Sequence, residues 1–143
     1  MDILHPIQSA VAPVFLLSGV GVTLSVLTGR LARIIDRARY LEERSDQSGV
    51  LDEATLAGLR TLARRAKYTN AAIALCTASA LFVSLVVMAL FASEFVGTDL
   101  SGIVAILFVA AMICLTGAFS AFLIECRLAT RILRFGSHGQ LNR

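Results

Sequence analysis

The chain has 143 residues, of which 57% are hydrophobic and 16% charged, and its formal net charge is +3 at pH 7. With a mean hydropathy of +0.77, a chain of this length lacks the polar surface that a soluble domain needs to cover its apolar residues. The composition therefore excludes an ordinary soluble globular protein and predicts an all-α membrane protein.

Three stretches without charged residues have predominantly apolar content, at residues 7–29, 68–93 and 100–124. Because about 20 helical residues cross a hydrocarbon layer of about 30 Å, each stretch is long enough to span a membrane. We expect three transmembrane helices in a single integral membrane domain that covers residues 1–143.

The first stretch could instead be a cleaved signal peptide, since both are early apolar segments. A signal peptide begins with basic residues, whereas residues 1–6 contain neither Lys nor Arg, and the arginines follow the apolar stretch. We therefore expect the first span to remain in the mature protein. Pro13 removes a backbone donor from this span and predicts a kink.

Small residues recur at heptad-like spacing on the first span and at every fourth position on the second. In lipid, such residues let helix backbones approach closely. The predicted helix-packing residues are Ser18, Gly21, Ser25, Thr28, Ala72, Cys76, Ala80 and Ser84. Three helices need fewer such faces, so we expect the chain to self-associate as a homo-oligomer.

Residues 30–67, between the first two spans, have apolar residues at helical spacing on both sides of a predicted turn at residues 45–49. Asp52 is a candidate amino-terminal cap for the second arm. The segment is predicted to form a cytoplasmic helical hairpin, whose mixed charges are typical of a solvated helix face.

All thirteen Lys and Arg residues lie in residues 30–67 and 127–143. Because cytoplasmic flanks carry the excess of basic residues, the amino terminus is predicted to lie outside and the carboxyl terminus in the cytoplasm. The basic residues nearest the membrane are expected to contact anionic inner-leaflet lipids. These are Arg30, Arg33, Arg64, Arg65, Lys67, Arg127, Arg131 and Arg134.

Residues 125–143 are predicted to form an interfacial segment that continues the third span, with its helix ending at Gly136. Glu125 is the acidic residue at the inner end of that span, and Arg30 and Arg33 lie at the inner end of the first, where either is a candidate partner. We expect Glu125 and Arg30 to form an interfacial ion pair that fixes helix packing.

The chain offers little chemistry beyond this. Cys76, Cys114 and Cys126 do not have the spacing of a metal site, and no serine lies in a nucleophile motif. The basic residues lack interleaved aromatic residues, which disfavours nucleic-acid binding. We therefore expect a protein without enzymatic activity, catalytic residues, metal or cofactor.

Two runs carry a resemblance to a known family: LTGRLARIIDRARYLEE at residues 27–43 and RRAKYTNAAIAL at residues 64–75. On the basis of these two runs, the chain resembles the DUF2721 family of small bacterial multi-pass membrane proteins of unknown function. The resemblance implies a protein of the bacterial inner membrane and brings no activity, substrate or catalytic residue.

Two functional hypotheses remain open. In the first, the chain assembles with copies of itself into a scaffold or an uncharged-lined pore. In the second, it is an accessory subunit whose hairpin docks a cytoplasmic or membrane partner protein while the spans anchor it.

Overall fold

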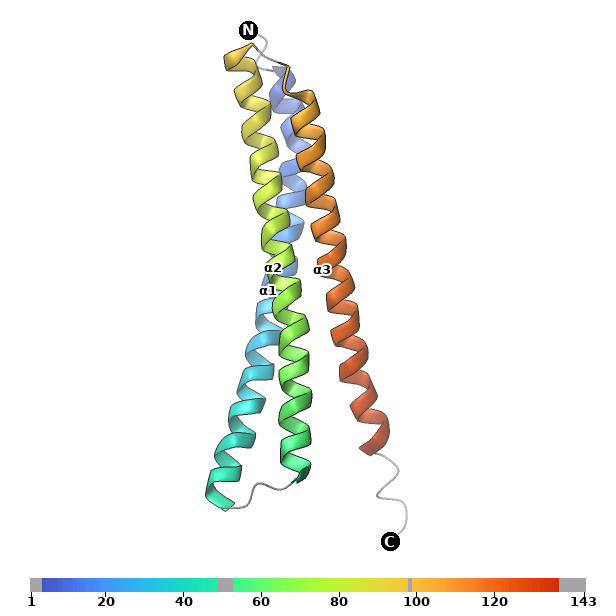
Figure 1. Cartoon of the computed structure of the whole chain (residues 1–143). Helices are drawn as coiled ribbons and strands as arrows, with labels where there is room; N and C mark the ends of the chain where they lie inside the picture. The colour runs from blue at the N-terminus through green and yellow to red at the C-terminus, as the bar shows by residue number, and fades with distance from the viewer. Residues whose placement is uncertain (1–3, 49–52, 98, 137–143) are drawn as a thin grey trace. The chain divides into compact units, whose positions relative to one another are not determined.

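The computed structural model describes residues 4–48, 53–97 and 99–136. These residues form three α-helices, α1 (Leu4–Ser48), α2 (Glu53–Val96) and α3 (Ser101–Gly136), and no strand occurs among them (Figure 1). Each helix is long and apolar enough to cross a membrane. The predictions of an all-helical fold and three membrane-spanning helices are confirmed, and the chain is a multi-pass membrane protein.

The helices extend beyond the apolar stretches because the polar segments that flank them are also good helix formers. α1 has 45 residues and α2 has 44, so both continue for several turns past the uncharged region. Helices already nucleated in the span can propagate into flanks rich in Ala, Leu, Arg and Glu. α1 also runs through Pro13 without interruption.

The chain divides into two compact units, each built from parts of all three helices. The first unit comprises residues 1–26 and 73–118, and the second comprises residues 27–72 and 119–143. In Figure 1 the first unit holds the blue start of α1, the yellow end of α2 and the orange start of α3.

The core of the first unit consists mainly of small and β-branched side chains. Its buried residues include Val20 of α1, Cys76, Val83 and Val86 of α2, and Ala111 of α3. The Cys76 thiol lies 3.7 Å from the carbonyl oxygen of Val20, which shows how closely α2 approaches α1. The buried Ser79 hydroxyl has no hydrogen-bond partner among the described residues.

The second unit has a largely apolar core that also contains the buried side chains of Thr69 and Glu125. Leu27 and Ile34 of α1 are buried together with Leu62 and Ala72 of α2. Between the predicted hairpin arms, a Cβ added at Gly58 would lie 3.7 Å from Leu41 Cδ1, an ordinary van der Waals distance. The α1 and α2 arms therefore pack in this unit, while the hairpin as a whole and the side of the membrane that it faces stay predictions.

The ends of the helices differ in part from expectation. Ser45–Ser48 belong to α1, so the predicted turn at residues 45–49 is wrong for its first four residues. The short polar side chains there are tolerated because Glu and Arg neighbours continue the helix. Residues 49–52, including the predicted cap Asp52, lie outside the described residues.

The link between α2 and α3 is set by one glycine and one carboxylate. Gly97 has a φ of 65°, which is left-handed, and its N–H donates to the Ser93 carbonyl at 3.0 Å, as at many helix ends. Asp99 Oδ1 accepts the Ser101 N–H at 3.0 Å and so satisfies one donor of the first turn of α3. α3 ends at Gly136, as the sequence predicts.

Candidate functional site

The best-defined polar cluster of the described residues is centred on Glu125 of α3, in the second unit. The Glu125 side chain is 0% exposed, although it carries a carboxylate. Arg30 of α1 places Nη2 3.0 Å from Glu125 Oε2. Arg65 of α2 donates from Nε and Nη2 to Oε1, at 3.1 and 2.8 Å. One carboxylate thus joins all three helices.

The neighbours of Glu125 on α3 fix the position of Arg30. Cys126 Sγ accepts a hydrogen bond from Arg30 Nη1 at 3.1 Å, and the guanidinium carbon lies 5.0 Å from the centre of the Phe122 ring. Glu125 and Cys126 follow Phe122 by three and four residues, so both lie beside Phe122 on one face of the helix. The guanidinium is therefore held by a carboxylate, a thiol and an aromatic face.

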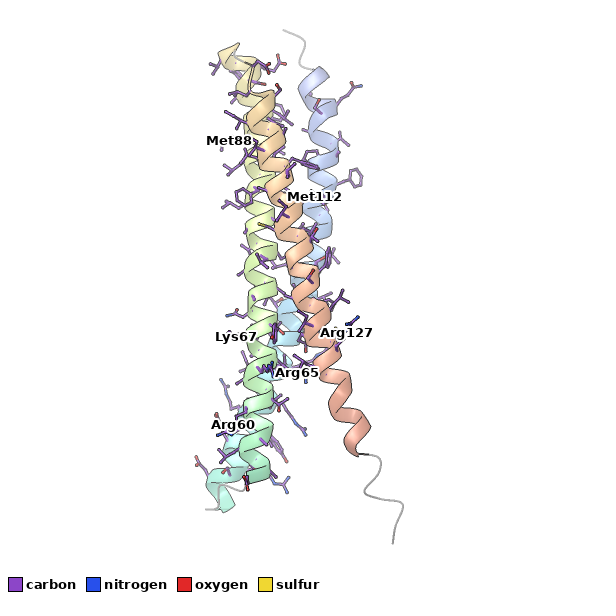
Figure 2. The ribbon with its side chains drawn as sticks, turned by 45° about the vertical axis from the view of Figure 1, so that its right-hand side comes forward. Arg60, Arg65, Lys67, Met88, Met112 and Arg127 are labelled. Atoms are coloured by element: carbon purple, nitrogen blue, oxygen red, sulfur yellow. The ribbon has the colours of Figure 1, made fainter. Side chains whose placement is uncertain are left out.

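Arg65 lies on α2, one turn before the buried Thr69. The Thr69 hydroxyl donates a hydrogen bond to the Arg65 carbonyl oxygen at 3.1 Å. Arg65 keeps 20% of its side chain exposed and Arg30 keeps 30%. Figure 2 labels Arg65 on α2, with Arg60 and Lys67 on the same helix and Arg127 on α3.

The electrostatics of the cluster follow from two guanidiniums and one carboxylate. A buried carboxylate is costly unless it is paired and hydrogen-bonded, and here each oxygen accepts from a guanidinium. Because both oxygens are engaged in charge-assisted hydrogen bonds, the carboxylate is poorly placed to act as a general base. The arrangement is suited to holding three helices together.

The structure places the predicted ion pair of Arg30 and Glu125 at bonding distance, and it adds Arg65 as a second partner. From the sequence, Arg65 is predicted to contact lipid only. Arg65 and Glu125 are separated by 60 residues, so no local spacing connects them. The available signal was that Glu125 directly follows the third uncharged stretch and that several arginines lie next to the ends of the first two.

The other basic residues predicted to meet lipid are more accessible. Arg33, Arg64, Lys67 and Arg127 are exposed. Arg131 and Arg134 belong to α3, but their side chains lie outside the described residues. Lipid contact at these positions stays a prediction.

The predicted packing faces have different surroundings. Ser18, Gly21, Ser25 and Thr28 of α1 are all exposed. On α2, the first two residues of the stripe, Ala72 and Cys76, are buried, Ala80 is half-buried and Ser84 is exposed. Within residues 68–93 of α2, the buried residues are instead Thr69, Ala72, Cys76, Ser79, Val83 and Val86.

The described residues contain no group of three or more His, Cys, Asp or Glu side chains that could hold a metal ion. All three cysteines are unbridged, and Cys76 is buried in the first unit. Among the described residues, the ion cluster at Glu125 is the main polar arrangement.

Comparison with known proteins gives one family. No curated protein and no solved structure matches the chain. The model of a family described as "Protein of unknown function (DUF2721)" matches residues 10–135. This match covers most of the chain, including both runs that carry the resemblance and all members of the ion cluster, and it confirms that resemblance. The chain belongs to the DUF2721 family.

Proposed function

We propose that the chain is a non-enzymatic structural subunit that self-associates in the membrane through the small-residue face of α1. The assembly is a scaffold or an uncharged-lined pore of the bacterial inner membrane. The single observation that carries the proposal is that this face, made by Ser18, Gly21, Ser25 and Thr28, is exposed on the described chain.

The exposure of this face follows from helix geometry. The buried residues Val20 and Leu27 lie two positions after Ser18 and Ser25. At about 100° per residue, two positions place a side chain nearly on the opposite side of a helix. The core therefore occupies one side of α1 and the small residues occupy the other.

The α1 face is also open to close approach. A Cβ added at Gly21 or at the neighbouring Gly19 would meet no atom within 4 Å. Lipid tails are as apolar as leucine, so a helix gains from another helix mainly where small residues allow tight packing. A second copy of α1 supplies a complementary surface of the same kind, as in a symmetric contact.

The distribution of charge supports an orientation for the assembly. All thirteen Lys and Arg residues belong to the sequence of the second unit. We therefore place the second unit at the cytoplasmic side, with its exposed Arg33, Arg64, Lys67 and Arg127 near anionic lipid headgroups. The amino terminus then lies outside and the carboxyl terminus in the cytoplasm.

The alternative proposal is an accessory subunit whose hairpin docks a partner protein. It is favoured by an open-sided cavity of about 340 Å³ between the two arms in the second unit. Ile34, Ala38 and Leu59 contribute apolar surface, and Glu42 and Arg60 contribute charges of opposite sign. Such a surface fits an apolar side chain of a partner helix with polar flanks.

Ser25→Leu tests self-association, because a leucine there blocks close approach of a second α1. The matched control is Val26→Leu, which changes an exposed residue that is already large. We expect Ser25→Leu to reduce the mass of the complex in nanodiscs to that of one chain, with Val26→Leu unchanged. An unchanged mass for Ser25→Leu contradicts the proposed interface.

Arg60→Glu tests the alternative, with Arg39→Glu as a matched exposed charge reversal outside the cavity lining. If the hairpin docks a partner, Arg60→Glu lowers recovery of that protein with the complex and Arg39→Glu does not. Equal recovery from both variants argues against docking at this cavity.

A further inference from the structure

The first unit contains an open-sided cavity of about 730 Å³ near the end of α2 and the start of α3. Its volume falls within the range of small-molecule sites, roughly 300–1,000 Å³. All three helices contribute apolar wall residues, which include Pro13, Val86, Leu90, Val104 and Phe108. From Ser101 to Phe108, the α3 wall is about 10 Å long at 1.5 Å per residue.

The charged residues that line the cavity lie near the end of α2 and just before α3. Glu94 and Asp99 are both lining residues, and both are exposed. Gly97 ends α2 with its left-handed φ, and the Ser101 N–H binds Asp99. The hydrogen bonds from Ser101 lower the pKa of Asp99 below its ordinary value, so this carboxylate is charged at neutral pH.

No lysine or arginine of the same unit neutralises these carboxylates. The sequence of residues 1–26 and 73–118 contains neither Lys nor Arg. The negative charge of Glu94 and Asp99 therefore lies beside an apolar wall without a lysine or arginine side chain from this unit. Low-dielectric walls strengthen the attraction of such a pair of charges for a cation.

We propose that this cavity binds a monovalent amphiphilic organic cation. Its ammonium or similar group lies beside Glu94 and Asp99, and its apolar body lies against Leu90 and Phe108. The charge complementarity selects a cation over an anion of the same shape, and the apolar wall selects a hydrophobic body over a small inorganic ion. The site does not depend on self-association through α1.

The test uses the full chain in phosphatidylcholine nanodiscs, which carry no net lipid charge. Binding of labelled tetraphenylphosphonium is measured by equilibrium dialysis and compared with binding to empty nanodiscs. Tetraphenylborate is the matched anion, because it has nearly the same shape and the opposite charge. We expect saturable binding of the cation to the protein, and no binding of the anion above that of empty nanodiscs.

The double variant Glu94→Gln/Asp99→Asn removes both charges with little change in shape. We expect it to weaken cation binding by at least about tenfold, since each carboxylate contributes an attraction of the kind seen for paired charges. The matched control is Glu43→Gln, which removes an exposed carboxylate in the other unit. We expect the control to bind as the unmodified chain does.

Because Glu94 and Asp99 are exposed, replacing their carboxylates with amide side chains should not prevent folding. The helical circular dichroism of the double variant checks that it folds. A second variant, Ala105→Phe, fills the cavity and should also abolish saturable binding. Equal binding of cation and anion, absent binding, or binding unchanged in the charge-removing variant overturns the proposal. The mass of the complex is read independently, so failure here is distinct from failure of self-association.

Discussion

Arg65 binds Glu125 through two hydrogen bonds to the same carboxylate oxygen, from Nε at 3.1 Å and from Nη2 at 2.8 Å. Arg30 binds the second oxygen at 3.0 Å. The carboxylate is wholly buried, whereas both arginines keep part of their side chains exposed. Within the second unit, Glu125 is therefore the residue through which α1, α2 and α3 are jointly connected.

Glu125→Gln should destabilise the chain, because it leaves two arginines facing a neutral amide. Removing one partner of a buried ion pair costs about 3–5 kcal/mol, and the partial exposure of the arginines places this cluster near the lower end, about 3 kcal/mol. Unfolding in mixed detergent micelles, followed by helical circular dichroism, measures the loss. Glu43→Gln, an exposed carboxylate on α1, should change the free energy of unfolding by less than about 0.5 kcal/mol.

Arg65 should couple to Glu125 more strongly than Arg30 does. Arg65 donates two hydrogen bonds to the carboxylate and is the less exposed of the two, so its coupling should be larger by about 1 kcal/mol. Double-mutant cycles with alanine variants measure both couplings. A cycle between the exposed Arg64 and Glu125 serves as the control, and a coupling there as large as that of Arg65 would contradict the assignment.

Two helix glycines should respond differently to a methyl group. A Cβ at Gly58 fits at 3.7 Å from Leu41 Cδ1, so Gly58→Ala should stabilise the chain by about 0.5–1 kcal/mol through backbone entropy. A Cβ at Gly117 would lie 3.2 Å from Leu75 Cδ1, so Gly117→Ala should lack this gain. Gly117→Leu should cost about 2 kcal/mol through overpacking. Parallel unfolding curves compare the three variants, and equal stability of the two alanine variants contradicts the packing.

The first turn of α3 should lose its Asp99 hydrogen bond in acid. The hydrogen bonds from Ser101 lower the pKa of Asp99 below its ordinary value of 3.8. The stabilisation that they give to the folded chain is therefore fully present above pH 3.8, and it is lost as the pH falls through the lower pKa of the folded state. Exchange of the Ser101 amide, relative to its intrinsic rate, should therefore accelerate below that point. In Asp99→Ala the relative rate should be high and independent of pH, and a pH dependence retained in this variant would assign it to another group.

The spans could be predicted from the sequence because hydropathy and length depend on local composition. The buried face of the second span could not be predicted in this way, and helix geometry gives the reason. A stripe at every fourth residue drifts by about 40° per step, so Ala80 and Ser84 leave the face that begins at Ala72. The buried α2 residues alternate steps of three and four, from Thr69 to Val86, and this pattern remains on one side.

The candidate site was partly accessible to sequence reasoning. Glu125 and Arg30 stand out because they lie at the ends of uncharged stretches. Arg65 does not, since it is one of several basic residues near the start of the second span and its link to Glu125 crosses 60 residues. Choosing among Arg64, Arg65 and Lys67 requires knowing which face of α2 meets α3, and the tertiary structure supplies that information.

The mass of the intact complex, released from its native membrane into nanodiscs, tests the central proposal most directly. Self-association through α1 predicts a uniform multiple of the 15.3 kDa chain, reduced to one copy by Ser25→Leu. A single chain of 15.3 kDa, alone or bound to an unrelated protein, would contradict it.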